Sequence, residues 1–469
     1  MPVSRIPYNE NVSAYKNKIK GIGTMTLKWK SAFAVMPFVL ALTACGGNTA
    51  TPSASTAPGT AAPGAATATA TATQAPAKNV SLKFSFWGND THKKMYEDII
   101  AKYKETHPHV SVEIVTIPFA DYQQKLSIMT ASKSAPDIAW LAERMIPQFL
   151  AGGQLADLEP LKKDSAYKYE DVIPSTLNLV TKDSKVYGIP FSTPPMMIYY
   201  NKTLFKAKNL ATPTELYKQG KWTYDEMLKA AKALTDSSKG VYGVNFVRNG
   251  WQNWPDALQS HFNAYGASIF SPDGNTFTLN SKEGELALQS YSDMIFKDKV
   301  HPKPGDQTTF DTGKIAMQKE LFSYMGKAKA VKDFEWDIAP LPAGPNGPGT
   351  TLGYAAYTVM KDSPNYAEAV ELLKFMTSPD NMKLTSQYFV PSRKSILESE
   401  EFFKQGPSSE SVKLSVVDQM AKASSLPSHK NWQQIDTRMQ TILDYLYTQS
   451  SPVKDVLSRA EKEVGPLLK

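Results

Sequence analysis

Residues 136–144 read PDIAWLAER, and the apolar start of this stretch predicts a buried strand over residues 138–140. Upstream, the sequence predicts two strands and two helices in alternation: strands over residues 80–86 and 110–117, and helices over residues 92–106 and 122–131. The order strand, helix, strand, helix, strand is typical of a parallel sheet with right-handed crossovers. The quoted stretch therefore completes a unit of the α/β class.

Large aromatic and charged residues gather where two of these strands end. They are Trp87, Asn89 and Asp90 after the first strand, and Trp140, Glu143 and Arg144 at the end of the third. Ligands of such sheets bind beyond the carboxyl ends of the strands, so both groups are expected at one crevice. The alternative is that Trp140 packs in the core while the two charges face water, because isolated charges are mostly exposed.

The first 45 residues have the features of a targeting sequence. Lys28 and Lys30 precede an uncharged apolar run over residues 31–44, which is shorter than the ~20 residues of a spanning helix but typical of a secretory signal. The run ends in LTAC, which resembles the lipobox of bacterial lipoproteins, and Cys45 is the only cysteine in the chain. We expect residues 1–45 to be a signal peptide with a lipobox, Met25 to be the true start, and Cys45 to carry the lipid.

Residues 46–78 consist almost entirely of Thr, Ala, Pro, Ser and Gly, with no charge before Lys78. Such a segment cannot bury enough apolar surface to become ordered, so it is interpreted as a flexible tether. Of the net charge of +7, a net +5 lies at or before Cys45, from six basic residues and one acidic residue. The rest of the chain is nearly neutral and has no basic stripe, so no nucleic-acid partner is expected.

The remaining residues, from 79 to 469, are too many for most single cores and predict two domains. Thr223 and Glu226 form the pattern of a capping box that opens a helix ending near Thr235. Ser363 and Pro364 are expected to cap a helix ending at Met376. The other predicted elements are strands over residues 196–201 and 241–246, and helices over residues 254–265, 281–296, 432–447 and 453–462.

Motifs of catalysis and metal binding are absent from the sequence, which lacks HExxH, GxSxG and a Walker loop. The glycine-rich stretch 344–353 is interpreted as a loop, and SPDGNTF at 271–277 as a hairpin turn rather than a calcium loop. His107 and His109 could ligate a metal, but are interpreted as exposed turn residues. No carboxylate pair is placed by a recognisable motif. We therefore assign no catalytic residue, no metal and no cofactor.

Two tryptophans lie close together in RNGWQNWPDALQ, which starts at residue 248. Trp251 and Trp254 can act as platforms for the C–H faces of a sugar, while neighbouring Arg and Asn side chains bond its hydroxyls. The alternative is that the tryptophans form a hydrophobic staple for the helix that begins at residue 254.

Five blocks of sequence occur in an order that resembles one protein family. They are PDIAWLAERMIPQFLAGGQLADLEP, VYGIPFSTPPMMIYYNKTLF, FDTGKIAMQ, WDIAPLPAGPNG and NYAEAVELLKFMTSPDNMK. In this order they resemble the extracellular solute-binding proteins of carbohydrate ABC importers, which include maltose-binding protein. The likeness covers residues 80–465 and implies a two-lobed type II periplasmic-binding-protein fold, each lobe a sheet flanked by helices. It places the lobes at residues 79–194 plus 349–394 and at residues 195–348 plus 395–469, joined by a hinge.

The resemblance also implies which residues bind the ligand. Trp140, Glu143 and Arg144 resemble the family's aromatic, acidic and basic cleft residues, and Trp251 resembles its aromatic platform ahead of the Trp254-Pro255 pair. The other implied cleft residues are Trp87, Asn89 and Asp90 after the first strand, Gly353 and Tyr354 in a glycine-rich segment, and Tyr324, for which Phe322 is an equal alternative.

By this resemblance the chain is expected to be a monomeric, membrane-tethered receptor that passes a sugar or oligosaccharide to an ABC permease. The lipid would be its only contact with the membrane. A lipid-anchored receptor is typical of a Gram-positive cell. Two alternatives stay open: a secreted carbohydrate-active enzyme, and a receptor of the same fold for a polyamine or peptide. The aromatic and mixed polar residues favour a neutral sugar, whose identity and length the sequence does not specify.

Overall fold

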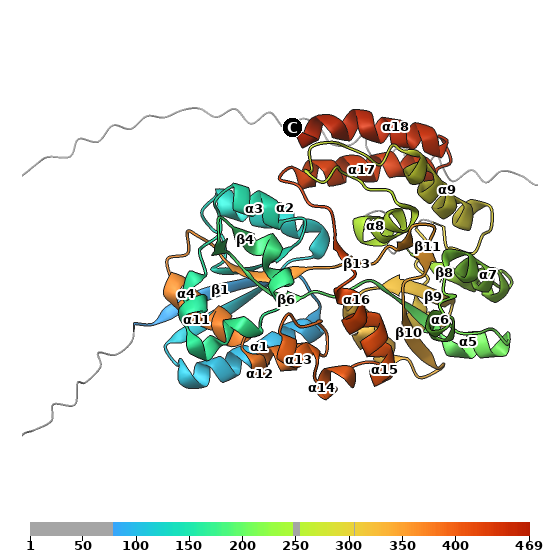
Figure 1. Ribbon diagram of the computed structural model, residues 1–469. Helices are drawn as coiled ribbons and strands as arrows, with labels where there is room; N and C mark the ends of the chain where they lie inside the picture. Colours follow the sequence, from blue (N-terminus) through green and yellow to red (C-terminus); the bar gives the residue numbers. More distant parts are fainter. Residues whose placement is uncertain (1–77, 247–253, 304) are drawn as a thin grey trace, which may run out of the picture. The chain divides into compact units, whose positions relative to one another are not determined.

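The computed structural model describes residues 78–246, 254–303 and 305–469, which carry two large β-sheets with helices packed against each (Figure 1). The first sheet has the strand order β2-β1-β3-β14-β6. Its strands are β1 Val80–Phe86, β2 Val110–Thr116, β3 Ile138–Ala142, β6 Ile189–Ser192 and β14 Ala355–Val359. β1 pairs in parallel with β2 and β3, as the sequence predicts. β14 returns from much later in the chain and pairs antiparallel with β3 and β6, so the sheet is mixed.

Helices pack against this sheet to form the first lobe. Helix α1 starts at Asp90 because the side chain of Asn89 accepts a hydrogen bond from the backbone N–H of His92. The elements of this lobe are α1 Asp90–Thr106, α2 Phe119–Ala131, α3 Ile146–Ala151, α4 Glu159–Lys163, α11 Tyr366–Met376, α12 Pro379–Thr385, the turns η1 Ser165–Tyr167, η2 Tyr169–Asp171 and η3 Pro174–Val180, and the hairpin β4 Thr181–Lys182 with β5 Lys185–Val186. Apolar residues of the larger helices and of all five strands form one buried cluster.

The second sheet has the strand order β10-β7-β9-β8. Its strands are β7 Met197–Asn201, β8 Tyr242–Asn245, β9 Ile315–Glu320 and β10 Trp336–Pro340. β7 pairs antiparallel with β10 and β9, whereas β8 pairs in parallel with β9. Every residue of β9 is buried, including its charged residues Lys319 and Glu320. This central strand therefore brings charge into the interior of the second lobe.

The second lobe is helix-rich, and two buried clusters hold it together. Thr223 caps α7 by accepting a hydrogen bond from the N–H of Glu226, as predicted. The lobe contains α5 Lys202–Ala207, α6 Pro213–Lys218, α7 Tyr224–Leu234, α8 Trp254–Tyr265, α9 Lys282–Phe296, α10 Met325–Ala330, α14 Glu400–Phe403, α15 Ser409–Val412, α16 Asp418–Met420, α17 Trp432–Tyr447, α18 Val453–Val464, the turns η5 Phe310–Thr312, η6 Phe322–Tyr324, η7 Lys413–Val417 and η8 Gly465–Leu468, and the hairpin β11 Ala343–Gly344 with β12 Gly347–Pro348.

Extended segments connect the two lobes. The strand β13 Thr351–Leu352 pairs in parallel with β15 Ser424–Ser425, and Leu352 forms an antiparallel bridge with Pro195. The N–H of Met196 donates to the carbonyl of Thr351 over 2.9 Å, and the N–H of Gly353 donates to the carbonyl of Pro194 over 2.8 Å. Chain segments from three parts of the sequence thus form the hinge side by side.

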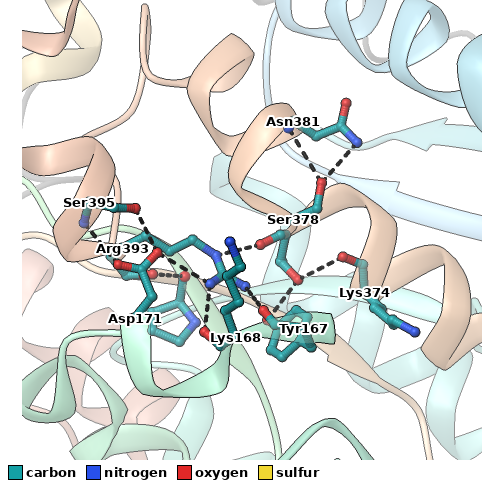
Figure 2. Close-up of polar contacts among 11 residues, drawn as sticks. Tyr167, Lys168, Asp171, Lys374, Ser378, Asn381, Arg393 and Ser395 are labelled. Atoms are coloured by element: carbon teal, nitrogen blue, oxygen red, sulfur yellow. Dashed lines mark hydrogen bonds and ion pairs between the residues drawn. The ribbon is translucent and has the colours of Figure 1, made fainter. Parts of the chain in front are cut away.

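A third crossing leaves the first lobe beside the fully buried Arg393, just before α13 Lys394–Leu397 (Figure 2). Its guanidinium donates to the carbonyls of Thr377, Lys168 and Tyr167 over 2.8 to 3.0 Å. It also forms an ion pair of 3.4 Å with Asp171, whose carboxylate accepts a hydrogen bond from the N–H of Ser395. The network fixes the chain where it leaves the first lobe.

Three local predictions are wrong. Helix α11 begins at Tyr366 rather than directly after Pro364, and the hydroxyl of Ser363 donates to Asp137 while accepting a hydrogen bond of 3.2 Å from the N–H of Asn365, the residue before the helix. The glycine-rich stretch 344–353 is not all loop, since it contributes to β11, β12 and β13. His107 and His109 are both half-buried rather than exposed, and the ring of His107 stacks on Tyr103 at 4.1 Å. The turn at 271–277 is confirmed, because Phe270 and Phe277 form an antiparallel bridge.

Within residues 78–246, 254–303 and 305–469, no helix has both the length and the apolar composition to cross a bilayer. In the same residues, no group of three or more His, Cys, Asp or Glu side chains could hold a metal ion.

Candidate functional site

A cavity of about 280 Å³ lies where residues of both lobes and of the hinge meet. The first lobe contributes residues that follow β1 and β3, the position expected for a ligand site in such a sheet. The second lobe contributes the end of β9 and the first turn of α8. Six of the predicted site residues line it: Trp87, Trp140, Glu143, Arg144, Gly353 and Tyr354.

Aromatic rings form much of the cavity wall. Trp87 is half-buried and packs edge to face against Trp140, with ring centroids 5.1 Å apart. Trp140 is only 2% exposed and also contacts Phe191 at 4.5 Å. It therefore combines both sequence interpretations, because it packs in the core of the first lobe and lines the cavity. The other aromatic lining residues are Phe119, Phe191, Phe246, Tyr354 and Phe389.

Glu143 stands at the end of β3, next to the hinge. It is 4% exposed, and its Oε2 accepts a hydrogen bond of 3.2 Å from the backbone N–H of Tyr354. Burial raises the pKa of Glu143 to about 7, although the adjacent Arg144 acts in the opposite direction. Near neutral pH this carboxyl can therefore donate or accept a hydrogen bond.

Arg144 lies between the lobes. Its Nη1 forms an ion pair of 3.5 Å with Oδ2 of Asp256 in α8, and its guanidinium lies over the ring of Phe119 at 4.5 Å. Burial lowers the pKa of Arg144, but the carboxylates of Asp256, Glu143 and Asp436 outweigh burial and raise it above its ordinary value. Arg144 is thus a permanent cation whose charge is neutralised by the chain itself.

Lys319 is a cavity residue that the sequence analysis missed. It is 3% exposed, its Nζ donates to the carbonyl of Ala257 and over 3.0 Å to Oγ of Ser260, and it lies 4.5 Å from the ring centre of Phe246. Burial lowers its pKa to about 7. The only signal in the sequence was a lysine two residues after the apolar run Ile315-Ala316-Met317 of a central strand. Asp256 was also missed, because an acid in the first turn of a helix is common.

Four predicted residues lie outside the cavity lining, and a fifth is not described. Asn89 is the cap of α1, and Asp90 is its exposed first residue. Trp254 is fully buried, stacks on Trp432 at 6.1 Å and donates to Asp436 over 2.8 Å. Tyr324 bonds the carboxylate of Asp311. Trp251 lies outside the described residues, as does Cys45.

The alternative to Tyr324 does not reach the cavity either. Phe322 is fully buried and packs on Phe402 with ring centroids 5.3 Å apart. Ser323, between the two aromatic residues, lines the cavity instead. The turn η6 thus directs a small polar side chain to the site and both aromatic rings to the core.

The two sheets, the hinge of extended segments and the cavity at their junction define a solute-binding protein of the type II fold. The sequence profile of the bacterial extracellular solute-binding proteins matches residues 88–383, and the chain belongs to this family. The predicted family and fold class are confirmed. The members of the family are binding proteins and not enzymes, so the chain is not a secreted carbohydrate-active enzyme.

Three similar proteins illustrate the range of the likeness. The arabinooligosaccharide-binding protein of Bacillus subtilis is 25% identical over 433 residues, which cover 83% of this chain and 94% of that protein. An uncharacterised lipoprotein of Streptomyces antibioticus is 27% identical over 328 residues, covering 66% and 69%. The structure of an ABC substrate-binding protein from Listeria monocytogenes in complex with cycloalternan is 22% identical, has a TM-score of 0.74, and is matched over 83% of this chain and 98% of that chain.

Proposed function

We propose that this chain is a lipid-anchored receptor that captures a sugar or oligosaccharide in the cavity and delivers it to an ABC permease. The observation that carries the proposal is the combination of aromatic walls with buried polar side chains at the junction of two lobes. Aromatic faces pack against the C–H groups of sugar rings, and buried polar groups fix their hydroxyls. Lobe closure about a hinge then encloses the solute.

The charges of the cavity favour a neutral solute. Arg144 is paired with Asp256, and Lys319 lies in the field of Asp256 and Glu320. Burial raises the pKa of Glu143 towards neutrality. Because no strong excess of either sign is left, a polyamine would lack the acidic cleft that it needs, whereas a sugar would meet matched donors and acceptors.

The relatives support the same solute class. One is named for arabino-oligosaccharides, and another, from Bacillus subtilis, is named for galacto-oligosaccharides. We propose Trp87, Trp140, Glu143, Gly353 and Tyr354 as solute contacts. Trp251 is proposed as a further platform from the segment outside the described residues.

We keep the lobe boundaries at residues 79–194 plus 349–394 and 195–348 plus 395–469. The bounds of the strands are compatible with this division, because each large sheet draws its strands from one lobe alone.

For the N-terminal region, we propose that Cys45 carries a thioether-linked diacylglyceryl group and, on its amino group, an amide-linked acyl chain such as palmitate. The segment 46–78 would then hold a monomeric receptor near the outer face of a Gram-positive membrane, with no other membrane contact and no nucleic-acid partner. The lipobox LTAC and the lipoprotein relative from Streptomyces antibioticus support this arrangement.

A thermal-shift screen of the full-length protein tests the solute class. Ligand binding raises apparent stability by mass action, so arabino-, galacto- and malto-oligosaccharides are the first candidates, with polyamines and short peptides as controls. A rise in melting temperature with at least one sugar, which chromatography then recovers unchanged, is expected. A shift with only a polyamine or a peptide would contradict the carbohydrate proposal.

A further inference from the structure

We infer that Arg144 and Asp256 are positioning residues that form a latch between the lobes, so that Arg144 acts on solute binding through Asp256 and not by bonding the solute. The inference rests on the proposed role as a receptor but not on the identity of the solute.

The two residues come from different lobes. Arg144 follows β3 of the five-stranded sheet, whereas Asp256 lies in the first turn of α8, whose apolar face packs with strands of the four-stranded sheet. The ion pair of 3.5 Å joins positions 112 residues apart in the sequence. An opening of the lobes at this point must therefore break it.

The guanidinium of Arg144 is largely buried among side chains of both lobes. The side chain of Arg144 is 8% exposed and that of Asp256 is 18% exposed. Phe119 covers one face of the guanidinium at 4.5 Å, and the carboxylate of Asp436 contributes further attraction from α17. Glu143, its neighbour in sequence, completes the set of charged groups that face it.

The energetics favour a reversible latch. Removing two charges from water roughly offsets their mutual attraction in the interior, so a buried ion pair adds little net stability. Loss of one partner is much more damaging, because it leaves an unpaired buried charge. The pair should therefore stabilise the closed form only slightly, so that open and closed molecules coexist. Closed forms in which the two groups do not pair should be strongly disfavoured.

This predicts a specific effect on affinity. If only the closed form retains solute, the apparent affinity is proportional to the closed fraction, whatever the solute is. Weakening the latch should lower the affinity for every solute by the same factor. A direct bond from Arg144 to one hydroxyl would instead give losses that differ from sugar to sugar.

Spin labels on the two lobes can measure the closed fraction without any solute. Cys45 is the only cysteine, so full-length protein with Cys45→Ser, Ile128→Cys and Thr441→Cys carries labels only on α2 and α17, at two exposed positions. Pulsed EPR on this protein should show a short-distance and a long-distance population. Because no sugar is added, the outcome is independent of whether the solute is a carbohydrate.

Arg144→Gln and Asp256→Asn should each reduce the short-distance population and the affinity for every sugar found in the screen at least about tenfold. The reversed pair, Arg144→Asp with Asp256→Arg, should restore both to within about threefold of the starting protein. Lys383→Gln is the matched control, because its ion pair with Glu401 also joins the lobes but is about half exposed, at 50% and 53%, and should contribute little.

Three results would overturn the inference. The first is a starting protein with no short-distance population. The second is single variants whose short-distance population and affinity match those of Lys383→Gln. The third is a reversed pair whose losses in both are as large as those of the two single changes combined. Affinity losses that differ between sugars would instead assign Arg144 to the solute.

Discussion

The backbone N–H of Tyr354 donates a hydrogen bond of 3.2 Å to Oε2 of Glu143, although 211 residues separate them in the sequence. Glu143 directly follows β3 of the first lobe, and Tyr354 follows the hinge strand β13. The hydroxyl of Tyr354 in turn donates to the carbonyl of Thr176 over 2.7 Å. The carboxyl of Glu143 thus lines the cavity while the backbone beside the hinge strand holds it in place, so a solute that contacts Glu143 contacts a residue bonded to the hinge.

Glu143→Ala should weaken sugar binding by about 1.5–3 kcal/mol, the usual range for a hydrogen bond to a charged group, which is roughly a 10- to 150-fold loss of affinity. Calorimetric titration measures this loss. Glu143→Gln is the matched control, because it keeps the shape and one acceptor, and it should lose less. Unchanged affinity in Glu143→Ala would show that this carboxyl does not contact the sugar.

The same residue predicts a dependence of stability on pH. Burial raises the pKa of Glu143 from 4.5 to about 7, so the folded state holds an extra proton between these values. The stabilising contribution of the protonated Glu143 is fully present below pH 4.5. It falls as the pH rises towards 7, because between these values the unfolded chain binds fewer protons than the folded one. Chemical unfolding at pH 5 and pH 7.5 should show a smaller decrease for Glu143→Gln than for the starting protein. Equal decreases would mean that Glu143 is ionised in the folded state over this range.

The local sequence predicted the elements better than their partners. Alternation in residues 80–86 and the helical pattern of residues 432–447 match β1 and α17, because these periodicities reflect which face of each element is buried. The pairing of β14 with β3 was not predicted, because the residue pattern of a strand does not indicate which distant strand it pairs with. The same limit applies to the pairing of Arg144 with Asp256.

The roles of the tryptophans also could not be predicted from the sequence. Trp140 and Trp254 were both predicted to contact the ligand, yet Trp140 lines the cavity and Trp254 stacks on Trp432 in the second lobe. Composition indicates that a large ring will be buried but not whether one of its faces borders a cleft. Similarly, Lys319 is recognisable as unusual only once all of β9 is known to be buried.

Trp254→Ala should destabilise the fold by about 3–5 kcal/mol, because it removes a fully buried ring and leaves a cavity. Trp251→Ala, by our proposal, should instead leave the melting temperature unchanged and weaken sugar binding by about 0.5–1.5 kcal/mol or more through the loss of stacking. Melting and titration of both variants separate the two roles. A large drop in melting temperature for Trp251→Ala would assign that ring to the core as well.

Arg393→Met should destabilise the protein by about 3–5 kcal/mol, because it removes a fully buried cation together with its hydrogen bonds to three carbonyls and its ion pair with Asp171 (Figure 2). The free energy of unfolding in urea measures this loss. Arg438→Met is a suitable control, since that arginine is paired with Glu463 but half exposed at 53%. If Arg393→Met destabilised the protein as little as Arg438→Met, the network in Figure 2 would not stabilise the chain where it leaves the first lobe.

Cys45→Ser should abolish the lipid anchor, because the serine hydroxyl cannot replace the thiol in the thioether bond to the lipid. We expect the variant to stay unprocessed by the lipoprotein route and to incorporate no labelled palmitate, and globomycin should block processing of the unchanged protein at the same step. Membrane fractionation with palmitate labelling in the native host measures both. Because Cys45 is the only cysteine, no other thiol can take the lipid. Undiminished labelling of Cys45→Ser would therefore place the acyl chain on a different kind of residue and remove the basis for the anchor.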